Sequence, residues 1–318
     1  MTNLILLFSI LAGDSWTYDP TIGFVNSTSS EIKSPEDFLI LADSCAKEGL
    51  SDQAIFCYDL INKSIKTGTV PEQSLFNKSS YLYQIGNLKS SHLAFRSFIK
   101  SFPSSKNLLT AKKNAMETAW KLIEKGEEKS VLGIIPYKTS QTGIKLLKES
   151  LDLYPFETFA PDFAFNLGLY YFKVDKDLFS AEQQFLSVID RYKSHNRVSA
   201  ALLMLGEIQM DRFKGIKYDS KELKDAILHL NRIMEEYPKS PEVNEAIKRR
   251  YLIIELLAEK EFQSAQYYFE RNHFNAGCMY LRSLMKKYPN TKASEKAQKI
   301  LKDAEDMKNQ KVNKNAGN

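Results

Sequence analysis

The chain has 318 residues, of which 43% are apolar and 26% charged, with 13 Gly and 10 Pro. These proportions exclude a collagen-like or wholly disordered chain and are typical of a globular protein with a sizeable core. The 44 basic and 39 acidic side chains give a net charge of +5 and are mixed along most of the length. This mixing argues against a nucleic-acid-binding stripe, so no nucleic-acid partner is predicted.

The first predicted element is a short apolar run from Leu4 to Leu11. It is far below the ~20 residues that span a bilayer and fits the core of a signal peptide. We therefore expect residues 1–15 to be a signal peptide; a misplaced start codon or a cytosolic N-terminal segment is the alternative, because no Lys or Arg precedes the run. The triplet Leu11-Ala12-Gly13 resembles the end of a lipoprotein leader, but Asp14 takes the place of the lipidated cysteine. We expect no lipid at Asp14, although the triplet is also compatible with chance.

An extended lead-in is expected over residues 16–33, followed by a repetitive helical region over residues 34–307. An aromatic residue with Pro, or the remnant of this pair, closes an amphipathic stretch five times: Phe102-Pro103, Tyr154-Pro155, Tyr192-Lys193, Tyr237-Pro238 and Tyr288-Pro289. Apolar residues three and four positions apart precede each pair, as in a helix with one buried face. A small residue early in the second helix of each pair allows close packing, and the Pro ends that helix.

This spacing resembles the tetratricopeptide repeat, a helix–turn–helix unit of ~34 residues. The resemblance predicts an all-α, tetratricopeptide-like helical-repeat solenoid of about five to six helix pairs, with a concave groove and a C-terminal capping helix. Insertions are expected at residues 126–141 and 214–220, and a disordered polar tail at 308–318. The alternative is a generic helical protein with chance periodicity, which several units in register disfavour.

Residues that could carry chemistry are sparse. The four histidines are expected on helix surfaces or in loops, because none has the spacing of a metal ligand: His92, His195, His229 and His273. Cys45, Cys57 and Cys278 are expected to be buried free thiols, with a Cys45–Cys57 pair as the alternative. No catalytic motif, cofactor site or metal site is predicted, so the chain is not expected to be an enzyme.

A repeat architecture instead favours binding of an extended or helical segment of another protein. The candidate peptide-groove residues are tyrosines in the first helices of three pairs: Tyr81, Tyr83, Tyr170, Tyr171, Tyr267 and Tyr268. The alternative for each ring is packing between repeats. Because adjacent residues on a helix point in different directions, one ring of Tyr267 and Tyr268 is expected to face outward.

The last repeat carries the most specific motif. It consists of Ala265, Tyr267-Tyr268, Arg271, Phe274, Ala276-Gly277, Tyr288-Pro289, Ala293 and Ala297. In these positions the stretch from Leu256 to Ala297 resembles the BamD family, the helical-repeat subunit of the outer-membrane β-barrel assembly machine. The resemblance implies a periplasmic scaffold held peripherally at the outer membrane through protein partners. In that family the C-terminal repeats contact the barrel insertase, and the N-terminal repeats receive targeting segments of unfolded barrel proteins. A general periplasmic tetratricopeptide scaffold in cell-wall, division or secretion machinery is the alternative.

Overall fold

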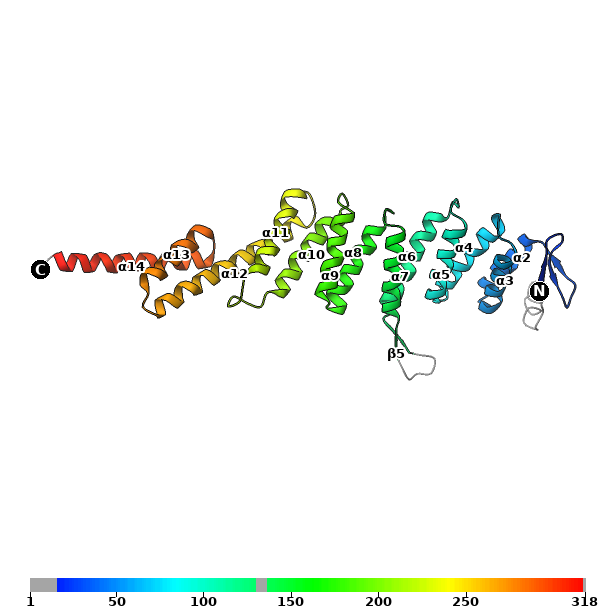
Figure 1. Ribbon diagram of the computed structural model, residues 1–318, viewed down its shortest axis with the longest axis horizontal. Coiled ribbons are helices and arrows are strands. Elements are labelled where there is room, and N and C mark those ends of the chain that lie inside the picture. The colour runs from blue at the N-terminus through cyan, green and yellow to red at the C-terminus, as the bar shows by residue number, and fades with distance from the viewer. Residues whose placement is uncertain (1–15, 130–135, 317–318) are drawn as a thin grey trace. The chain divides into compact units, whose positions relative to one another are not determined.

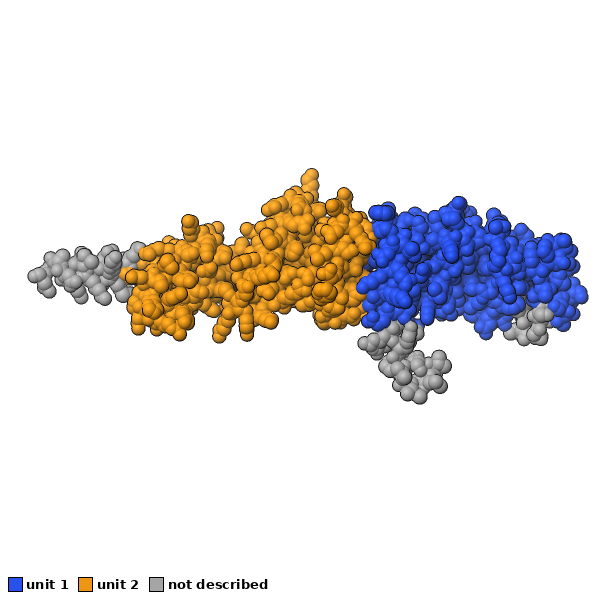
Figure 2. Space-filling view, viewed as in Figure 1, with its two compact units in different colours: residues 1–163 blue, residues 164–318 orange. Residues whose placement is uncertain are grey.

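The computed structural model describes residues 16–129 and 136–316. The predicted signal peptide, with Asp14, and residues 130–135 of the first predicted insertion lie outside this part of the chain. The chain divides into two compact units, residues 1–163 and 164–318, which Figure 2 colours separately. Each unit is built from consecutive helices that pack against their neighbours in the chain.

The first unit begins with a small antiparallel sheet, which sequence reasoning expected only as an extended lead-in. Its strands are β1 (Trp16–Asp19), β2 (Gly23–Asn26) and β3 (Ile32–Lys33), in the order β1-β2-β3. The sheet packs on α2 (Pro35–Lys47), where the buried Phe38 ring stacks on Phe24 at 4.3 Å and lies 5.1 Å from Trp16. These aromatic contacts stabilise strands that are otherwise too short to be stable.

Three helix pairs make up most of the first unit (Figure 1). Their members are α2 with α3 (Ser51–Ser64), α4 (Thr69–Gln84) with α5 (Leu88–Ser101), and α6 (Leu108–Lys125) with α7 (Thr139–Leu153). Ser34 caps α2 by accepting a hydrogen bond from the Asp37 N–H at 3.1 Å, and Pro35 occupies the first turn, where no helical N–H is needed. Apolar residues at helical spacing fill the spaces between these helices.

The third pair contains the first predicted insertion. Strands β4 (Glu127–Lys129) and β5 (Pro136–Lys138) form an antiparallel hairpin between α6 and α7. Figure 1 shows this hairpin extending beyond the ends of the two helices. The helices themselves still pack closely, because Gly143 lies where a Cβ would come within 2.7 Å of the Ala119 carbonyl oxygen.

The second unit holds three further pairs and a final helix. After α8 (Ala160–Tyr170), which begins in the first unit, and the π-helical turn η1 (Tyr171–Asp175), its helices are α9 (Leu178–Arg191), α10 (Arg197–Arg212), α11 (Lys221–Glu236), α12 (Val243–Glu270), α13 (Phe274–Lys287) and α14 (Lys292–Ala316). The last helix caps the unit by burying Ala293, Ala297 and Leu301 against α12 and α13. Its helical backbone continues to Ala316, over most of the range predicted to be a disordered tail.

Small residues explain how closely the helices of a pair approach. A Cβ on Gly168 would lie 2.7 Å from the Phe185 ring, and one on Gly277 would lie 2.6 Å from the Phe269 ring. Neither position leaves room for a larger side chain. The six helix pairs of the described residues therefore form a tetratricopeptide-like helical-repeat fold of the solenoid class, as the sequence predicts.

Two predictions about individual residues can be compared with the structure. The three cysteines are free thiols, of which Cys45 and Cys57 are buried as predicted, whereas Cys278 is only partly buried. Burial raises the pKa of the Cys57 thiol to about 12. The expected surface or loop position is wrong for His92, which is fully buried on α5. Its Nδ1 lies 2.9 Å from the Ala115 carbonyl oxygen of α6, so this histidine bridges two helices.

Candidate peptide-binding surfaces

The six candidate tyrosines occupy different environments. Tyr81 and Tyr171 are buried, Tyr83, Tyr170 and Tyr268 are partly buried, and Tyr267 is 50% exposed. The expectation that one ring of the adjacent pair faces outward is confirmed, because Tyr267 is exposed while Tyr268 packs against the protein. Tyr81 lines a pocket of the first unit, Tyr267 and Tyr268 line a pocket of the second unit, and Tyr268 also borders a neighbouring pocket beside His273 and Phe274.

The N-terminal pocket lies among α2, α3 and α4 and has a volume of about 320 Å³. Its lining residues are Asp43, Ala46, Lys47, Tyr58, Asn77, Ser80, Tyr81 and Gln84. Helix α2 supplies the first three of these residues and α4 the last four, so the pocket joins the first helices of two consecutive pairs. The hydroxyl group of Tyr81 lies 2.8 Å from the Ser51 hydroxyl oxygen.

Asp43 is the polar centre of the N-terminal pocket. Its carboxylate accepts a hydrogen bond from the Tyr58 hydroxyl at 2.6 Å and one from the Asn77 Nδ2 at 3.0 Å. Burial, followed by the hydrogen bond to Asp43, raises the pKa of Tyr58, so this phenol stays a donor. The carboxylate is thus held in place before any ligand arrives, and the amide oxygen of Asn77 is left to accept a further hydrogen bond.

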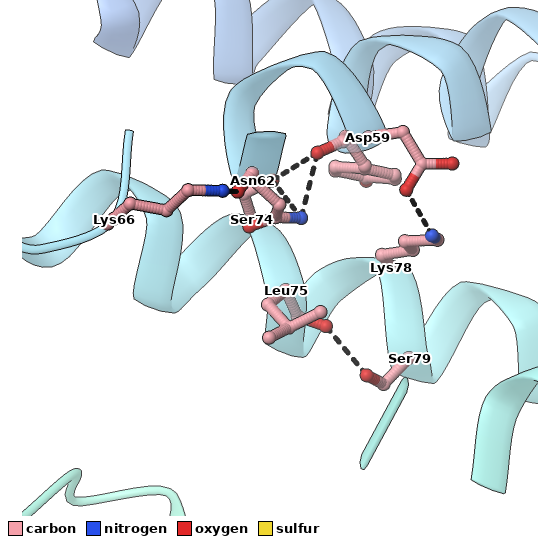
Figure 3. A network of polar contacts seen from close by, with 8 residues as sticks. Asp59, Asn62, Lys66, Ser74, Leu75, Lys78 and Ser79 are labelled. Atoms are coloured by element: carbon pink, nitrogen blue, oxygen red, sulfur yellow. Dashed lines mark hydrogen bonds and ion pairs between the residues drawn. The ribbon is translucent and has the colours of Figure 1, made fainter. Parts of the chain in front are cut away.

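A second polar network fixes α3 against α4 beside this pocket (Figure 3). Asn62 donates to the Tyr58 carbonyl oxygen at 2.8 Å and to the Ser74 hydroxyl at 3.2 Å, and Ser74 is itself fully buried. Lys78 forms an ion pair with Asp59 across the same two helices. Because these bonds fix the helix carrying Asn77 and Tyr81, the lining of the N-terminal pocket is preorganised.

The C-terminal pocket lies in the second unit and has a volume of about 400 Å³. Its lining residues are Ile216, Lys217, Lys260, Gln263, Ser264, Tyr267, Tyr268 and Tyr280. They come from α12, from α13 and from the connection between α10 and α11, which contains the predicted insertion at residues 214–220. This insertion therefore forms one wall of the pocket that holds two of the candidate tyrosines.

Aromatic rings form a second wall of the C-terminal pocket. Tyr268 stacks on Tyr280 with ring centroids 5.0 Å apart and an interplanar angle of 22°. The hydrogen bond between their hydroxyl groups raises the pKa of Tyr268. Tyr267 is covered from another direction by Arg271, whose guanidinium carbon lies 3.7 Å from the ring centroid. Such a contact between a cation and a ring holds both side chains in place at the pocket rim.

Two lysines give the C-terminal pocket its charge. The Lys260 ammonium group donates a hydrogen bond to the Tyr218 carbonyl oxygen, which ties α12 to the insertion. Neither Lys217 nor Lys260 forms an ion pair with a carboxylate of the described residues. The pocket therefore combines aromatic surface with positive charge that the protein does not neutralise.

The remaining candidate tyrosines have structural contacts. The Tyr83 ring lies 4.2 Å below the Lys121 ammonium group, and the hydrogen bond between these residues raises the pKa of Lys121. Tyr170 and Tyr171 make an edge-to-face contact with ring centroids 6.2 Å apart, at the junction of α8 and η1. Packing explains these three rings without a ligand, and their role in binding stays a prediction.

Sequence reasoning missed Asp43, Asn77, Lys217 and Lys260. The signal for the first two is their separation of 34 residues, which equals one repeat and places them at equivalent positions of consecutive first helices. The two lysines had no such signal. Lys217 belongs to an insertion outside the repeat, so its position has no counterpart in the other repeats.

The described residues hold neither a metal cluster nor a membrane span. Within residues 16–129 and 136–316, no group of three or more His, Cys, Asp or Glu side chains is arranged to hold a metal ion. Among the described helices, none combines the length and the apolar character that crossing a bilayer requires.

The family of the chain follows from its C-terminal half. Residues 135–317 match the model of the family YfiO, described as outer membrane lipoprotein. The chain belongs to this family. A curated relative, the outer membrane protein assembly factor BamD of Vibrio cholerae, is 25% identical over 177 residues, which cover 51% of this chain and 71% of the relative. The YfiO match includes the whole C-terminal pocket and excludes the N-terminal pocket.

Solved structures of tetratricopeptide-repeat proteins are also similar to the chain. A thermophilic repeat protein of Thermus thermophilus is 14% identical, with a TM-score of 0.31 and coverage of 70% of this chain and 99% of that one. A repeat protein of Parabacteroides merdae is 12% identical, with a TM-score of 0.33 and coverage of 84% and 97%.

Proposed function

We propose that the chain is a BamD-like scaffold in the assembly of outer-membrane proteins. It acts in the periplasm, peripherally at the outer membrane, and it binds the barrel insertase and segments of unfolded barrel proteins. The observation that carries this proposal is the YfiO match over residues 135–317, to which the BamD relative adds the assembly role. The scaffold works by holding partners, with no catalytic step of its own.

The two pockets divide this work. The C-terminal pocket, inside the family match, holds the insertase against its tyrosines and its unpaired lysines. The N-terminal pocket, whose Asp43 and Asn77 are fixed by neighbouring bonds, takes the backbone of an extended client segment. Amide hydrogen bonds suit a client of variable sequence, because every residue except Pro supplies the same backbone groups.

Affinity purification tests the proposed partner. The tagged full chain, isolated from detergent-solubilised envelopes, is expected to bring the barrel insertase with it. A double variant, Tyr267→Ala with Lys260→Ala, should lose most of the insertase, whereas Tyr83→Ala, at a residue outside both pockets, should keep it. Recovery of the wild-type chain from the cytosolic fraction without the insertase would overturn the proposal, as would peptidoglycan-synthesis partners in its place.

Crosslinking tests which pocket holds which partner. Photoreactive residues should replace Tyr267 in the C-terminal pocket and Gln84 in the N-terminal pocket, because both side chains are exposed and substitution leaves the core intact. We expect insertase adducts from position 267 and client adducts from position 84. The same partner at both positions would contradict the division of labour.

Attachment to the membrane through partners, without a lipid, is part of the proposal. A lipoprotein is lipidated on the thiol of the cysteine that follows its leader, and the carboxylate of Asp14 cannot form that thioether. Palmitate labelling of the expressed full chain should therefore give no labelled band, and Asp14→Cys, which restores the missing thiol, should give one. Labelling of the wild-type chain would overturn this step.

A further inference from the structure

The outer edge of β1 has no strand partner among the residues that the structure describes. In the order β1-β2-β3, the first strand has β2 on one side and no strand of the described residues on the other. Helix α2 covers one face of the sheet through β2 and β3. An edge of this kind presents backbone donors and acceptors that a further strand can use.

The register shows which groups face this edge. The Asn26 N–H donates to the Glu31 carbonyl oxygen at 2.8 Å, so the backbone groups of Asn26 point toward β3. Successive residues of a strand point their N–H and C=O groups to opposite sides, so those of Val25 point toward its partner Thr17 in β1. The backbone groups of Trp16 and Tyr18 therefore point away from the sheet, toward the free edge.

The face of the sheet opposite α2 is incompletely covered. Thr17, Val25 and Ile32 form one cross-strand row on the face opposite α2, and Ile32 is 54% exposed. Trp16 lies at the start of the edge strand, is only 5% exposed, and its indole N–H has no hydrogen-bond partner. A buried donor without an acceptor is costly, so this end of the sheet has an unmet hydrogen-bonding group.

We propose that the free edge of β1 binds an extended segment of a client protein as a fourth, added strand. The client is a chain of alternating apolar and polar residues, the pattern of a transmembrane β-strand before it has paired. Such a strand has unpaired backbone groups along both sides, and pairing one side with Trp16 and Tyr18 satisfies both partners. Its apolar residues extend the row of Thr17, Val25 and Ile32. This inference rests on the proposed function for the identity of the client.

Tryptophan fluorescence can detect this binding directly. The sequence contains two tryptophans, so Trp120→Phe in the full chain leaves Trp16 as the sole reporter. The probe is a ten-residue peptide of alternating Val and Thr, with a terminal Lys for solubility. We expect a saturable change in Trp16 emission. The same peptide N-methylated at two adjacent central residues lacks an N–H on each edge and is expected to bind about tenfold more weakly.

A pair of variants separates the backbone from the side chain. Tyr18→Pro removes the outward N–H and leaves the hydrogen bonds between β1 and β2, whereas Tyr18→Ala removes the ring and keeps the N–H. Relative to Tyr18→Ala, Tyr18→Pro should bind the probe about tenfold more weakly at an unchanged melting temperature. Equal binding by the two variants overturns the inference. Absence of binding to the full chain also overturns it.

The test is independent of the proposed function. Both Tyr18 variants should still co-purify with the insertase, because β1 is remote in sequence from the C-terminal pocket. If the insertase is absent from the wild-type purification but the peptide binds, the proposed function fails and the strand-binding edge stands. If the insertase is present but Tyr18→Pro and Tyr18→Ala bind the peptide equally, the proposed function stands and the strand-binding edge fails.

Discussion

The N-terminal and C-terminal pockets differ in how their charged groups are satisfied. In the N-terminal pocket the Asp43 carboxylate already accepts bonds from Tyr58 and Asn77. In the C-terminal pocket Lys217 and Lys260 have no carboxylate partner within the described residues. A carboxylate that bridges helices contributes mainly to the fold, whereas an ammonium group without a carboxylate partner can still pair with an anionic group of a ligand. Loss of the Asp43 carboxylate should therefore change stability, and loss of the two ammonium groups should change insertase binding.

The largest effect is expected from the aromatic core between the N-terminal sheet and α2. Phe38→Ala empties a site against Trp16 and Phe24 and should lower the free energy of unfolding of the first unit by about 3–5 kcal/mol. Both tryptophans lie in this unit, so urea unfolding followed by tryptophan fluorescence reports on it alone. Phe56→Ala on α3, where the ring is 42% exposed, is the control and should cost less than about 1 kcal/mol. Equal losses would show that the sheet does not stabilise α2.

A smaller effect is expected at the pocket centres. Asp43→Ala leaves the Tyr58 hydroxyl and the Asn77 amide without their acceptor and should cost about 1–3 kcal/mol of unfolding free energy. Lys260→Ala removes an exposed hydrogen bond and should change that free energy by no more than about 0.5 kcal/mol. Thermal unfolding followed by circular dichroism measures both. If Asp43→Ala proves neutral, the contrast between the two pockets fails.

Helical periodicity made the repeats predictable, but it could not reveal the sheet. The aromatic-Pro endings and the small residues, such as Gly168 against Phe185, recur at repeat spacing and indicated the helix pairs and both insertions. Strands β1, β2 and β3 are two to four residues long, too short for an alternating pattern to emerge. Their stability depends on Phe38, which the sequence places in a helix, so the contact is visible only in three dimensions.

The candidate sites were only partly predictable for a related reason. Repeat position selects the helix that carries a residue, and this was enough for Tyr267 and Tyr268. It does not decide between facing a pocket and packing inside the repeat, and Tyr171 packs inside. Lys217 reaches the C-terminal pocket from an insertion, whose path no repeat pattern specifies.

Salt dependence sharpens the comparison between the pockets. The double variant Lys217→Ala with Lys260→Ala should weaken insertase binding by about tenfold at low ionic strength, and by less as salt screens the lost charges. The control removes two exposed lysines of α14, Lys299→Ala with Lys302→Ala, and matches the change in net charge. Retention of the insertase across a salt gradient measures the effect. Equal losses from the two double variants would assign the effect to net charge instead of to the pocket.

The smallest expected effect concerns pH, and it separates the two units through their buried histidines. Burial lowers the pKa of His92 in the first unit and of His229 in the second below the ordinary value of 6.5. As the pH falls through 6.5, these histidines bind protons in the unfolded chain but not yet in the folded chain. The free energy of unfolding therefore decreases until the pH reaches the lower pKa of the folded state. Each histidine can contribute a slope of at most about 1.4 kcal/mol per pH unit.

His92→Gln should flatten the pH dependence of urea unfolding seen by tryptophan fluorescence, because both tryptophans report on the first unit. His229→Gln should leave that signal unchanged, since its titration belongs to the second unit. The same flattening from both variants would show that the two units unfold as one, and the stability differences between the pockets would then have to be measured on the whole chain.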